Sequence, residues 1–427
     1  MDRSNIQDPP EYEDQEQSDP LKKGWMIGSP PPADKIIKFI HEDNKFPQMR
    51  WSLANIRQLV PTAQISHGLG PISNLPQRPH DISQVQWVDA EGNTKTFMDM
   101  MNLTYTDGLM VLHKGHVVYE KYFGVMNPTK PHLAMSVTKS FVGTLGAILV
   151  HEGKIDDTKQ VIHYVPELAR TAYGDATVRQ VLDMTISVKY SEDYSDENAE
   201  VWNYSQSAGS MPRLPDYDGP ETLYEFLLTL RKDKEHQHDE RFWYKTVNTE
   251  ILAWIIRRVT QKPLAVYLSE RIWQRMGAAD DAYFMVDSIG TESAGGGFNT
   301  CLHDLARFGE VMRNRGFFNG QQVIPAEVVD DIKFNGDKKK FEPAGYHTLE
   351  GWSYRNMWWV GEDAVGEFEA RGIHGQRIHV NTKAEMTIVR YASHPYASNI
   401  INDPPTQAAY RALANAIIFD IIIESIL

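Results

Sequence analysis

The stretch Pro131-His-Leu-Ala-Met-Ser136-Val-Thr-Lys139-Ser140 runs directly into the apolar segment Phe141-Val-Gly-Thr-Leu-Gly-Ala-Ile-Leu-Val150. The apolar run and its small residues predict a buried helix whose first turn carries Ser136 and Lys139. Residues three apart share a helix face, so the hydroxyl and the amine can meet. Apolar surroundings lower the pKa of a lysine, and a neutral amine beside a hydroxyl forms a nucleophile–base pair.

The same tetrad has a plainer interpretation. A serine near a helix start is more often a cap, and a lysine three residues later is more often solvated. The catalytic interpretation therefore depends on partners elsewhere in the chain. An unpaired ammonium opening so apolar a helix would be costly, which favours a specific role for Lys139.

Composition and charge exclude several classes of protein. The chain has 427 residues, 41% of them hydrophobic, and a net charge of −14, which argues against general nucleic-acid binding. A single cysteine, Cys301, cannot form an internal disulfide and fits a reducing compartment. We expect no secretory signal, because residues 1–20 are acidic and contain no apolar core, and no membrane span, because no apolar run is long enough. We expect a soluble, cytoplasmic protein with no membrane partner.

The order of predicted elements indicates the fold class. Strand patterns occur near residues 108–122 and again over 352–391, with helical patterns between them. This order predicts an α+β fold, in which an antiparallel sheet built from both ends of the chain is flanked by helices. The predicted parts are an N-terminal extension (1–50), a discontinuous α/β domain (51–160 and 290–427) and an inserted, mainly helical domain (161–289). The site is expected in the cleft between the last two.

Finer predictions accompany this outline. Residues 1–33 are polar and are expected to be disordered or draped over the surface. The long aromatic and acidic segment 190–215 is expected to be an irregular, functional loop. Helices are predicted over 34–41, 51–60, 177–185, 221–230, 249–258, 263–273, 302–313 and 413–427, and strands over 108–113, 115–122, 352–360, 368–373, 377–380 and 386–391.

Two further stretches offer partners for the serine and lysine. In Phe242-Trp-Tyr244-Lys-Thr246-Val-Asn248, Tyr244 is the polar residue expected to face a cleft, where a nearby lysine would help its hydroxyl lose a proton. The alternative is a core tyrosine with a satisfied hydroxyl. In Arg371-Gly-Ile-His374-Gly375-Gln376-Arg377, a glycine within a strand indicates close approach of a ligand or backbone. A lone histidine such as His374 is more often structural than catalytic.

These stretches, in this order, resemble the serine β-lactamase and penicillin-binding-protein superfamily, and within it the class C-like branch of 6-aminohexanoate-dimer hydrolases and related esterases. The resemblance spans about residues 50–427. Its motifs are Ser136-Val-Thr-Lys139, Glu192-Asp-Tyr194, Tyr244-Lys-Thr246, Ala294-Gly-Gly-Gly-Phe-Asn299-Thr300 and Gly372-Ile-His374-Gly375-Gln376.

The resemblance implies a role for each of these residues. Ser136 would be the acylated nucleophile, and Lys139 and Tyr244 would share the general base and acid work. The backbone N–H groups of Ser136 and Gln376 would form the oxyanion hole. The residues expected to bind substrate are Tyr194, which would hydrogen-bond the amide nitrogen, His374, Gly375 and Asn299. No metal or cofactor is implied; the partner would be a small-molecule amide or ester, and a homodimer is one option.

Two departures from the superfamily pattern change the expected substrate. Ile373 or His374 stands where other members carry the lysine of Lys-Thr-Gly, and Thr246 replaces an asparagine. We therefore expect hydrolysis of linear amides or carboxylic esters rather than β-lactams. Three alternatives stay open: a β-lactamase or D-alanyl-D-alanine peptidase, a non-catalytic binding protein with this fold, and a cytosolic α/β protein with coincidental motifs.

Overall fold

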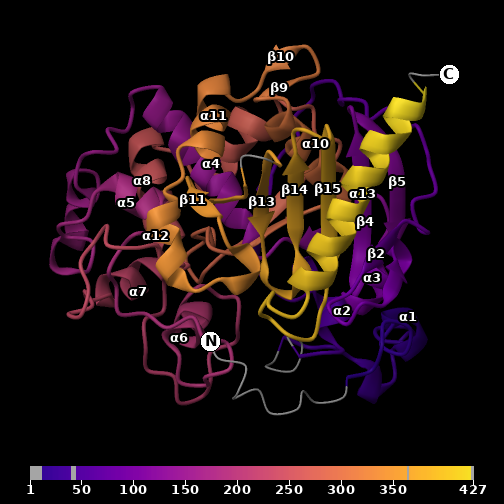
Figure 1. The fold of residues 1–427 in the computed structure, drawn as a ribbon. Helices are drawn as coiled ribbons and strands as arrows, with labels where there is room; N and C mark the ends of the chain where they lie inside the picture. The colour runs from indigo at the N-terminus through magenta and orange to yellow at the C-terminus, as the bar shows by residue number, and fades with distance from the viewer. Residues whose placement is uncertain (1–11, 40–44, 363–364, 425–427) are drawn as a thin grey trace.

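A seven-stranded antiparallel sheet forms the centre of the computed structural model, which describes residues 12–39, 45–362 and 365–424 (Figure 1). Its strands, in spatial order, are β11 (Ser353–Arg355), β12 (Trp358–Val360), β13 (Glu367–Arg371), β14 (Arg377–Asn381), β15 (Met386–Ala392), β4 (Thr106–His113) and β5 (His116–Tyr122). Strand β15 pairs with β4, so the two ends of the sequence meet inside one sheet. This confirms the predicted fold class.

Alternating side chains of β4 divide the core into two layers. Leu109 and Val111 pack with α3 (Phe97–Leu103) and α13 (Asp403–Glu424), which crosses the face of the sheet turned toward the viewer in Figure 1. Met110 and Leu112 belong to the larger cluster on the opposite face, with α4 (Val137–His151) and α10 (Leu302–Arg313). Successive strand residues point to opposite faces, so one strand supports both layers.

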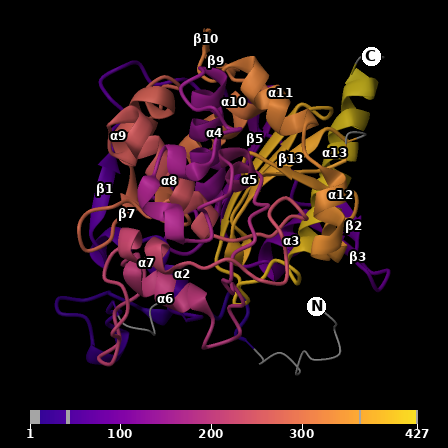
Figure 2. The same ribbon diagram turned by 90° about the vertical axis from the view of Figure 1, so that its left-hand side faces the viewer.

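The helical part lies beside the sheet (Figure 2). Its elements are η4 (Val161–His163), η5 (Pro166–Arg170), α5 (Val178–Leu182), α6 (Glu200–Ser207), α7 (Leu223–Thr229), α8 (Val247–Thr260), α9 (Leu264–Leu268) and η6 (Ser269–Trp273). Helix α4 contacts α8 on one side and strands β12 and β13 on the other. The helix that carries the Ser-x-x-Lys tetrad therefore connects the two parts.

Small residues allow this close packing of α4. A Cβ atom added at Gly143 would lie 2.2 Å from the carbonyl oxygen of Asn356, and one at Gly146 would lie 3.0 Å from the side chain of Leu252. The expectation of close packing at these glycines is confirmed.

A second, four-stranded sheet positions the segment that leads into α4. Its order is β1 (Thr62–Ile65), β7 (Ala282–Met285), β8 (Phe298–Thr300) and β6 (His132–Leu133). Strand β6 pairs with β8, and the N–H of Ala134 donates to the carbonyl of Phe298 at 2.8 Å. The chain is thus fixed two residues before Ser136. These short strands were not predicted from the sequence.

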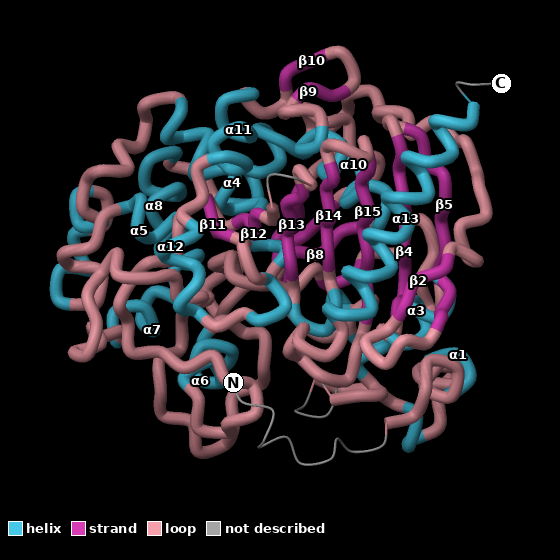
Figure 3. The backbone as a smooth tube through the Cα atoms, in the orientation of Figure 1, coloured by secondary structure: helices cyan, strands magenta, loops and turns pink. Residues whose placement is uncertain are grey.

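Smaller elements complete the chain (Figure 3). They are α1 (Pro20–Lys23), η2 (Ala33–Lys35), α2 (Met49–Ser52), η3 (Ile56–Gln58), β2 (Gln86–Val88), β3 (Thr94–Thr96), β9 (Phe317–Phe318), β10 (Gln321–Gln322), α11 (Ala326–Phe334), α12 (Lys338–Phe341), η7 (Glu342–Ala344), η8 (His347–Leu349) and η9 (Ile373–Gly375). Within the described ranges, no helix combines the length and the apolarity needed to cross a membrane.

The N-terminal segment takes the second of its two predicted forms. Residues 1–11 lie outside the described residues, and 12–33 are draped over the surface and contact the sheet. The side chain of Gln15 donates to the carbonyl of Thr106 at 2.6 Å, and the buried Arg50 forms a 3.1 Å ion pair with Asp107. The predicted boundaries of the three parts of the chain stay a prediction.

Several element predictions need correction. The helix predicted over 51–60 is broken into α2 and η3, and that over 34–41 is reduced to the single turn η2, with 40 and 41 outside the described residues. The strand predicted over 352–360 is two strands, because Asn356 and Met357 adopt positive φ of 48° and 63° and reverse the chain. Helix α6 lies inside the segment predicted to be an irregular loop. The terminal helix begins at Asp403, and 425–427 lie outside the described residues.

Candidate active site

Ser136 and Lys139 meet at the start of α4. Ser136 is the residue just before the helix, with φ −68° and ψ −5°, and its side chain does not cap the helix. The Nζ of Lys139, one turn later, donates to Ser136 Oγ at 2.8 Å and to the carbonyl oxygen of Gly295 at 2.5 Å. The structure therefore brings the two residues together as the tetrad predicts.

Burial changes the acidity of this lysine. Lys139 is only 1% exposed, and burial lowers its pKa to about 8, although the negative charges of Glu192 and Glu250 act in the opposite direction. At neutral pH about a tenth of such amines are unprotonated. Lys139 is thus able to accept a proton from Ser136.

Tyr244 is the third residue in this cluster. It lies just before α8, and Lys139 Nζ is 5.1 Å from the centroid of its ring. Burial raises the pKa of Tyr244 well above its usual value, although its hydrogen bond with Ser136 acts the other way. The tyrosine is therefore neutral. This corrects the expectation that the neighbouring lysine would make its hydroxyl lose a proton more easily.

Glu192 connects the 190–200 segment to the tyrosine motif. Its carboxylate accepts the N–H of Thr246 at 2.7 Å, the hydroxyl of Thr246, and the hydroxyl of Tyr194 at 3.2 Å. The threonine that replaces the superfamily's asparagine therefore serves as an anchor for this segment. Tyr194 lies two residues after Glu192, with its ring edge-on against Trp202 at 5.9 Å between centroids.

The turn after β13 lies against the segment that precedes Ser136. A Cβ atom added at Gly372 would lie 2.9 Å from the carbonyl oxygen of Ala134 and 3.0 Å from Cβ of Gln376. His374 and Gly375 have positive φ of 62° and 98° and form the turn itself. The turn that carries Gln376, whose N–H is predicted to form part of the oxyanion hole, thus lies beside the residues that precede Ser136.

His374 is held by its neighbours in this turn. Its Nδ1 lies 2.7 Å from the carbonyl oxygen of His394, and burial lowers the pKa of His374 to about 4. The imidazole is therefore neutral, so it does not supply the positive charge of the missing strand lysine.

Gly375 and Gln376 are braced from the adjacent strand β15. The carbonyl of Gly375 accepts from Nε of Arg390 at 3.0 Å. The buried side chain of Gln376 pairs with the backbone of Ala392, donating to its carbonyl at 2.6 Å and accepting its N–H at 3.0 Å. The side chain of Gln376 is thus structural, and only its backbone is available for the predicted role.

Asn299 is placed differently. It is fully buried in β8, opposite Leu133, and its Nδ2 donates to the carbonyl of Gly297 at 2.9 Å. Its Oδ1 has no hydrogen-bond partner among the described residues. No hydrogen bond within the described part of the chain connects it to Ser136, Lys139 or Tyr244.

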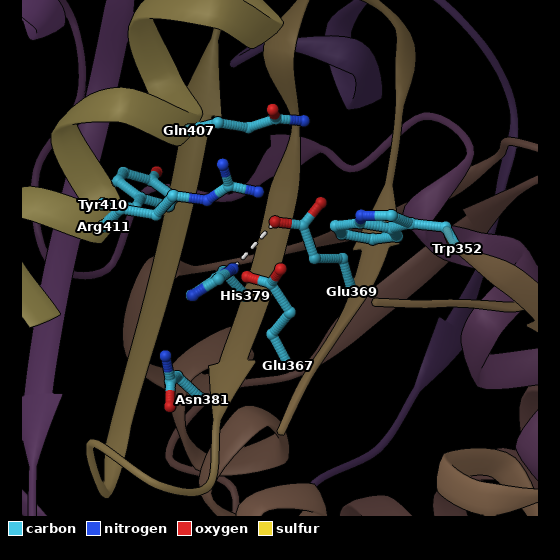
Figure 4. A pocket seen from close by; sticks show the side chains of 8 residues that line it. All are labelled: Trp352, Glu367, Glu369, His379, Asn381, Gln407, Tyr410 and Arg411. Carbon is cyan, nitrogen blue, oxygen red and sulfur yellow. Dashed lines mark hydrogen bonds and ion pairs between the residues drawn. The ribbon is translucent and has the colours of Figure 1, made fainter. Parts of the chain in front are cut away.

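Two cavities lie away from this cluster. One, of about 10 Å³, lies under α13 and has room for about one water molecule. Figure 4 shows its lining, in which His379 pairs with Glu369 at 2.8 Å. The other, of about 390 Å³, is lined by residues of the helical part, including Lys189, Glu200 and Phe226. Neither is lined by the candidate catalytic side chains.

One cluster has the donor types of a metal site. Single ligand atoms of Asp280, Cys301 and Asp304 lie within 4.8 Å of one another. The carboxylate of Asp304 already accepts the N–H groups of Ala279 and Asp280 and pairs with Arg307 at 2.7 Å. Burial raises the pKa of the Cys301 thiol well above its usual value, which fits a structural cysteine.

Comparison with known proteins identifies the family of the chain. The beta-lactamase family matches residues 104–411, and the chain belongs to this family of hydrolases. More particularly, it is 35% identical over 378 residues to the 6-aminohexanoate-dimer hydrolase of Paenarthrobacter ureafaciens, with 88% of this chain and 91% of the relative covered.

Solved structures give the same result. A Bacillus anthracis protein described as a 6-aminohexanoate-dimer hydrolase superposes with a TM-score of 0.82 at 30% identity, covering 90% of this chain and 98% of its own. A family VIII carboxylesterase matches with a TM-score of 0.54 at 16% identity, over 74% and 97% of the two chains, which shows the shared fold alone.

Proposed function

We propose that this protein is a serine hydrolase that cleaves linear amide or carboxylic ester bonds through an acyl-enzyme on Ser136. The observation that carries the proposal is the 2.8 Å contact between Ser136 Oγ and the buried Lys139 Nζ. A hydroxyl beside an amine whose pKa is lowered to about 8 is an activated nucleophile.

Acylation follows from this arrangement. Ser136 Oγ bonds to the substrate carbonyl carbon while its proton passes to Lys139, and the carbonyl oxygen becomes an oxyanion. The N–H groups of Ser136 and Gln376 would donate hydrogen bonds to that oxygen and stabilise its charge. Neutral Tyr244, hydrogen-bonded to Ser136, would give its proton to the leaving nitrogen or oxygen as the bond to carbon breaks, and would recover a proton from Lys139.

In deacylation, water is the nucleophile and Ser136 is the leaving group. Water attacks the acyl-serine ester and its proton passes to Lys139. The bond between the acyl carbon and Ser136 Oγ breaks, and the serine regains its proton from Lys139. A carboxylic acid is released together with the amine or alcohol of the first step.

The charge around the turn after β13 favours linear amides over β-lactams. His374 is neutral, and the buried Arg371 is already paired with Glu369 at 3.0 Å and with Asp403. Neither His374 nor Arg371 therefore offers an uncommitted positive charge to a substrate carboxylate. The two relatives named above are called hydrolases of 6-aminohexanoate dimer, a linear amide, and we propose the same substrate class here, with Tyr194, His374 and Gly375 as binding residues.

A substrate panel tests the proposal. Wild-type protein and Ser136→Ala are compared on p-nitrophenyl butyrate, 6-aminohexanoate dimer and a chromogenic cephalosporin, and each is treated with a fluorophosphonate. We expect wild type to cleave the ester or the linear amide, to be labelled on Ser136, and to act weakly on the cephalosporin. Equal activity of wild type and Ser136→Ala, without labelling, would exclude the proposal, and dominant cephalosporin turnover would assign the β-lactamase alternative.

A further inference from the structure

Glu250 on α8 is an acid buried close to the candidate site. It is 1% exposed, and its carboxylate accepts three hydrogen bonds from described residues: its Oε1 accepts the Tyr204 hydroxyl at 2.6 Å and the N–H of Gly295 at 2.7 Å, and its Oε2 accepts the N–H of Ala294 at 3.2 Å. Burial raises the pKa of Glu250, but these donors and the charge of Arg257 act against that rise. Three converging donors fit an ionised carboxylate.

Gly295 connects this carboxylate to the lysine. Its N–H donates to Glu250, and its carbonyl accepts from Lys139 Nζ at 2.5 Å. A Cβ atom at Gly295 would lie 2.3 Å from Cγ2 of Thr246 and 2.7 Å from the hydroxyl oxygen of Tyr204, so the space admits only a glycine. The carbonyl that orients Lys139 therefore has a position fixed by Glu250.

Two negatively charged side chains, from different parts of the chain, act on Lys139. Glu192 lies on the segment before α6 and Glu250 on α8, and both stabilise the ammonium form against burial. The remaining polar neighbours are the neutral Tyr244, whose ring centroid is 5.1 Å from Nζ, and Ser136. Glu192 is bound to Thr246 and Tyr194, whereas Glu250 is bound to the N–H of Gly295, the residue whose carbonyl Lys139 contacts.

We propose that Glu250 is a positioning residue of the active site: it holds the Gly295 carbonyl that directs Lys139 toward Ser136, and its charge balances the burial of the ammonium. This inference rests on the proposed function, because it assigns Glu250 a part in the same acylation step. If the inference is correct, removing the charge of Glu250 and moving its carboxylate have separate effects on the acylation of Ser136.

The test uses Glu250→Gln and Tyr204→Phe, with the rate of Ser136 acylation by p-nitrophenyl butyrate followed against pH. Removing the charge favours neutral Lys139, so the rising limb of the Glu250→Gln profile should move to lower pH by about half a unit or more. The acylation rate that Glu250→Gln reaches at high pH should be about tenfold lower than that of wild type, because an amide NH₂ replaces one of the two accepting oxygens. Tyr204→Phe keeps the carboxylate, and its limb should stay at the wild-type pH.

A second variant covers the case in which Glu250→Gln does not fold. Glu250→Asp keeps the charge but withdraws the carboxylate, so its plateau should fall while the limb stays near the wild-type pH. A folded Glu250→Gln with the wild-type limb, or Glu250→Asp that acylates at the wild-type rate, overturns the inference. In either case fluorophosphonate labelling of Ser136 in wild type separates this failure from failure of the proposed function.

Discussion

Lys139 and Tyr244 both contact Ser136, and the pH dependence of acylation distinguishes which of them is the base. Burial lowers the pKa of Lys139 to about 8, while it raises that of Tyr244 well above 10. The base form of lysine is the neutral one, so acylation should rise with pH through about 8 and then level off. Stopped-flow acylation between pH 6 and 11 checks this.

A matched substitution sharpens this pH experiment. Lys139→Arg keeps a permanent positive charge and should lose the rise near pH 8 together with at least about 100-fold of the acylation rate. A wild-type rate that continues to climb beyond pH 10 would instead assign the base to Tyr244.

Tyr194 tests the preference for amide substrates. Its hydroxyl is bound only to Glu192, at 3.2 Å, among the described residues, and lies on the segment anchored at Thr246. If it hydrogen-bonds the amide nitrogen, Tyr194→Phe should reduce amide hydrolysis about tenfold or more and leave ester hydrolysis within about twofold. Paired kcat/KM values on 6-aminohexanoate dimer and p-nitrophenyl butyrate give the comparison.

Tyr190→Phe is the control for this effect. Tyr190 lies in the same segment, and its buried hydroxyl has no hydrogen-bond partner among the described residues. Tyr190→Phe should leave the hydrolysis of both substrates unchanged. Equal losses on amide and ester in Tyr194→Phe would remove the proposed role.

At the scale of elements, local sequence pattern predicts helices better than it predicts turns. Helix α10 spans the predicted residues Leu302–Arg313, because a strong apolar stripe defines it. The strand pair β11 and β12 could not be separated by pattern, since the reversal depends on positive φ at Asn356 and Met357. Helix α6 was missed because its buried face, which includes Tyr204, is interrupted by polar residues.

The candidate site shows the same limit. Ser136 and Lys139 are one turn apart on a single helix, so the sequence alone predicts their contact. Glu192 and Glu250 act on Lys139 through the fold, from positions 53 and 111 residues away, and no local pattern reveals that. The aromatic cluster before α8 made Tyr244 a candidate and the resemblance to a family gave it a role, but only the structure showed that its hydroxyl stays protonated.

Helix α4 gives a stability prediction. Gly143→Ala would place a Cβ atom 2.2 Å from the Asn356 carbonyl, a backbone atom that cannot rotate away. We expect a loss of roughly 1–3 kcal/mol in the free energy of unfolding, measured with urea. Gly70→Ala, where an added Cβ has no neighbour within 4 Å, should change it by less than about 0.5 kcal/mol. Similar values for the two variants would contradict the packing described for α4.

At the scale of the whole molecule, one buried ionic network fastens α13 to the sheet. Asp403, the first residue of α13, pairs with Arg371 at the end of β13 and with Arg377 at the start of β14, and both arginines also pair with Glu369. All four side chains are 5% exposed or less. The turn that carries His374, Gly375 and Gln376 connects these two strands, so the network supports the candidate site from behind.

Asp403→Asn should therefore lower the free energy of unfolding by about 3–5 kcal/mol, because two buried guanidinium groups lose a charged partner. Urea unfolding measures this. Glu270→Gln, which breaks the half-exposed pair with Lys262, should cost less than about 1 kcal/mol. Equal costs for the two variants would show that the network is not important for stability.

The central claim is a covalent bond between substrate and Ser136. The most direct measurement is mass spectrometry of peptides from protein quenched in acid during the first turnovers of p-nitrophenyl butyrate. We predict a butyryl group on the peptide that contains Ser136, and none in Ser136→Ala. A protein that hydrolyses the ester while Ser136 stays unmodified, or one that carries the acyl group elsewhere, would contradict this account.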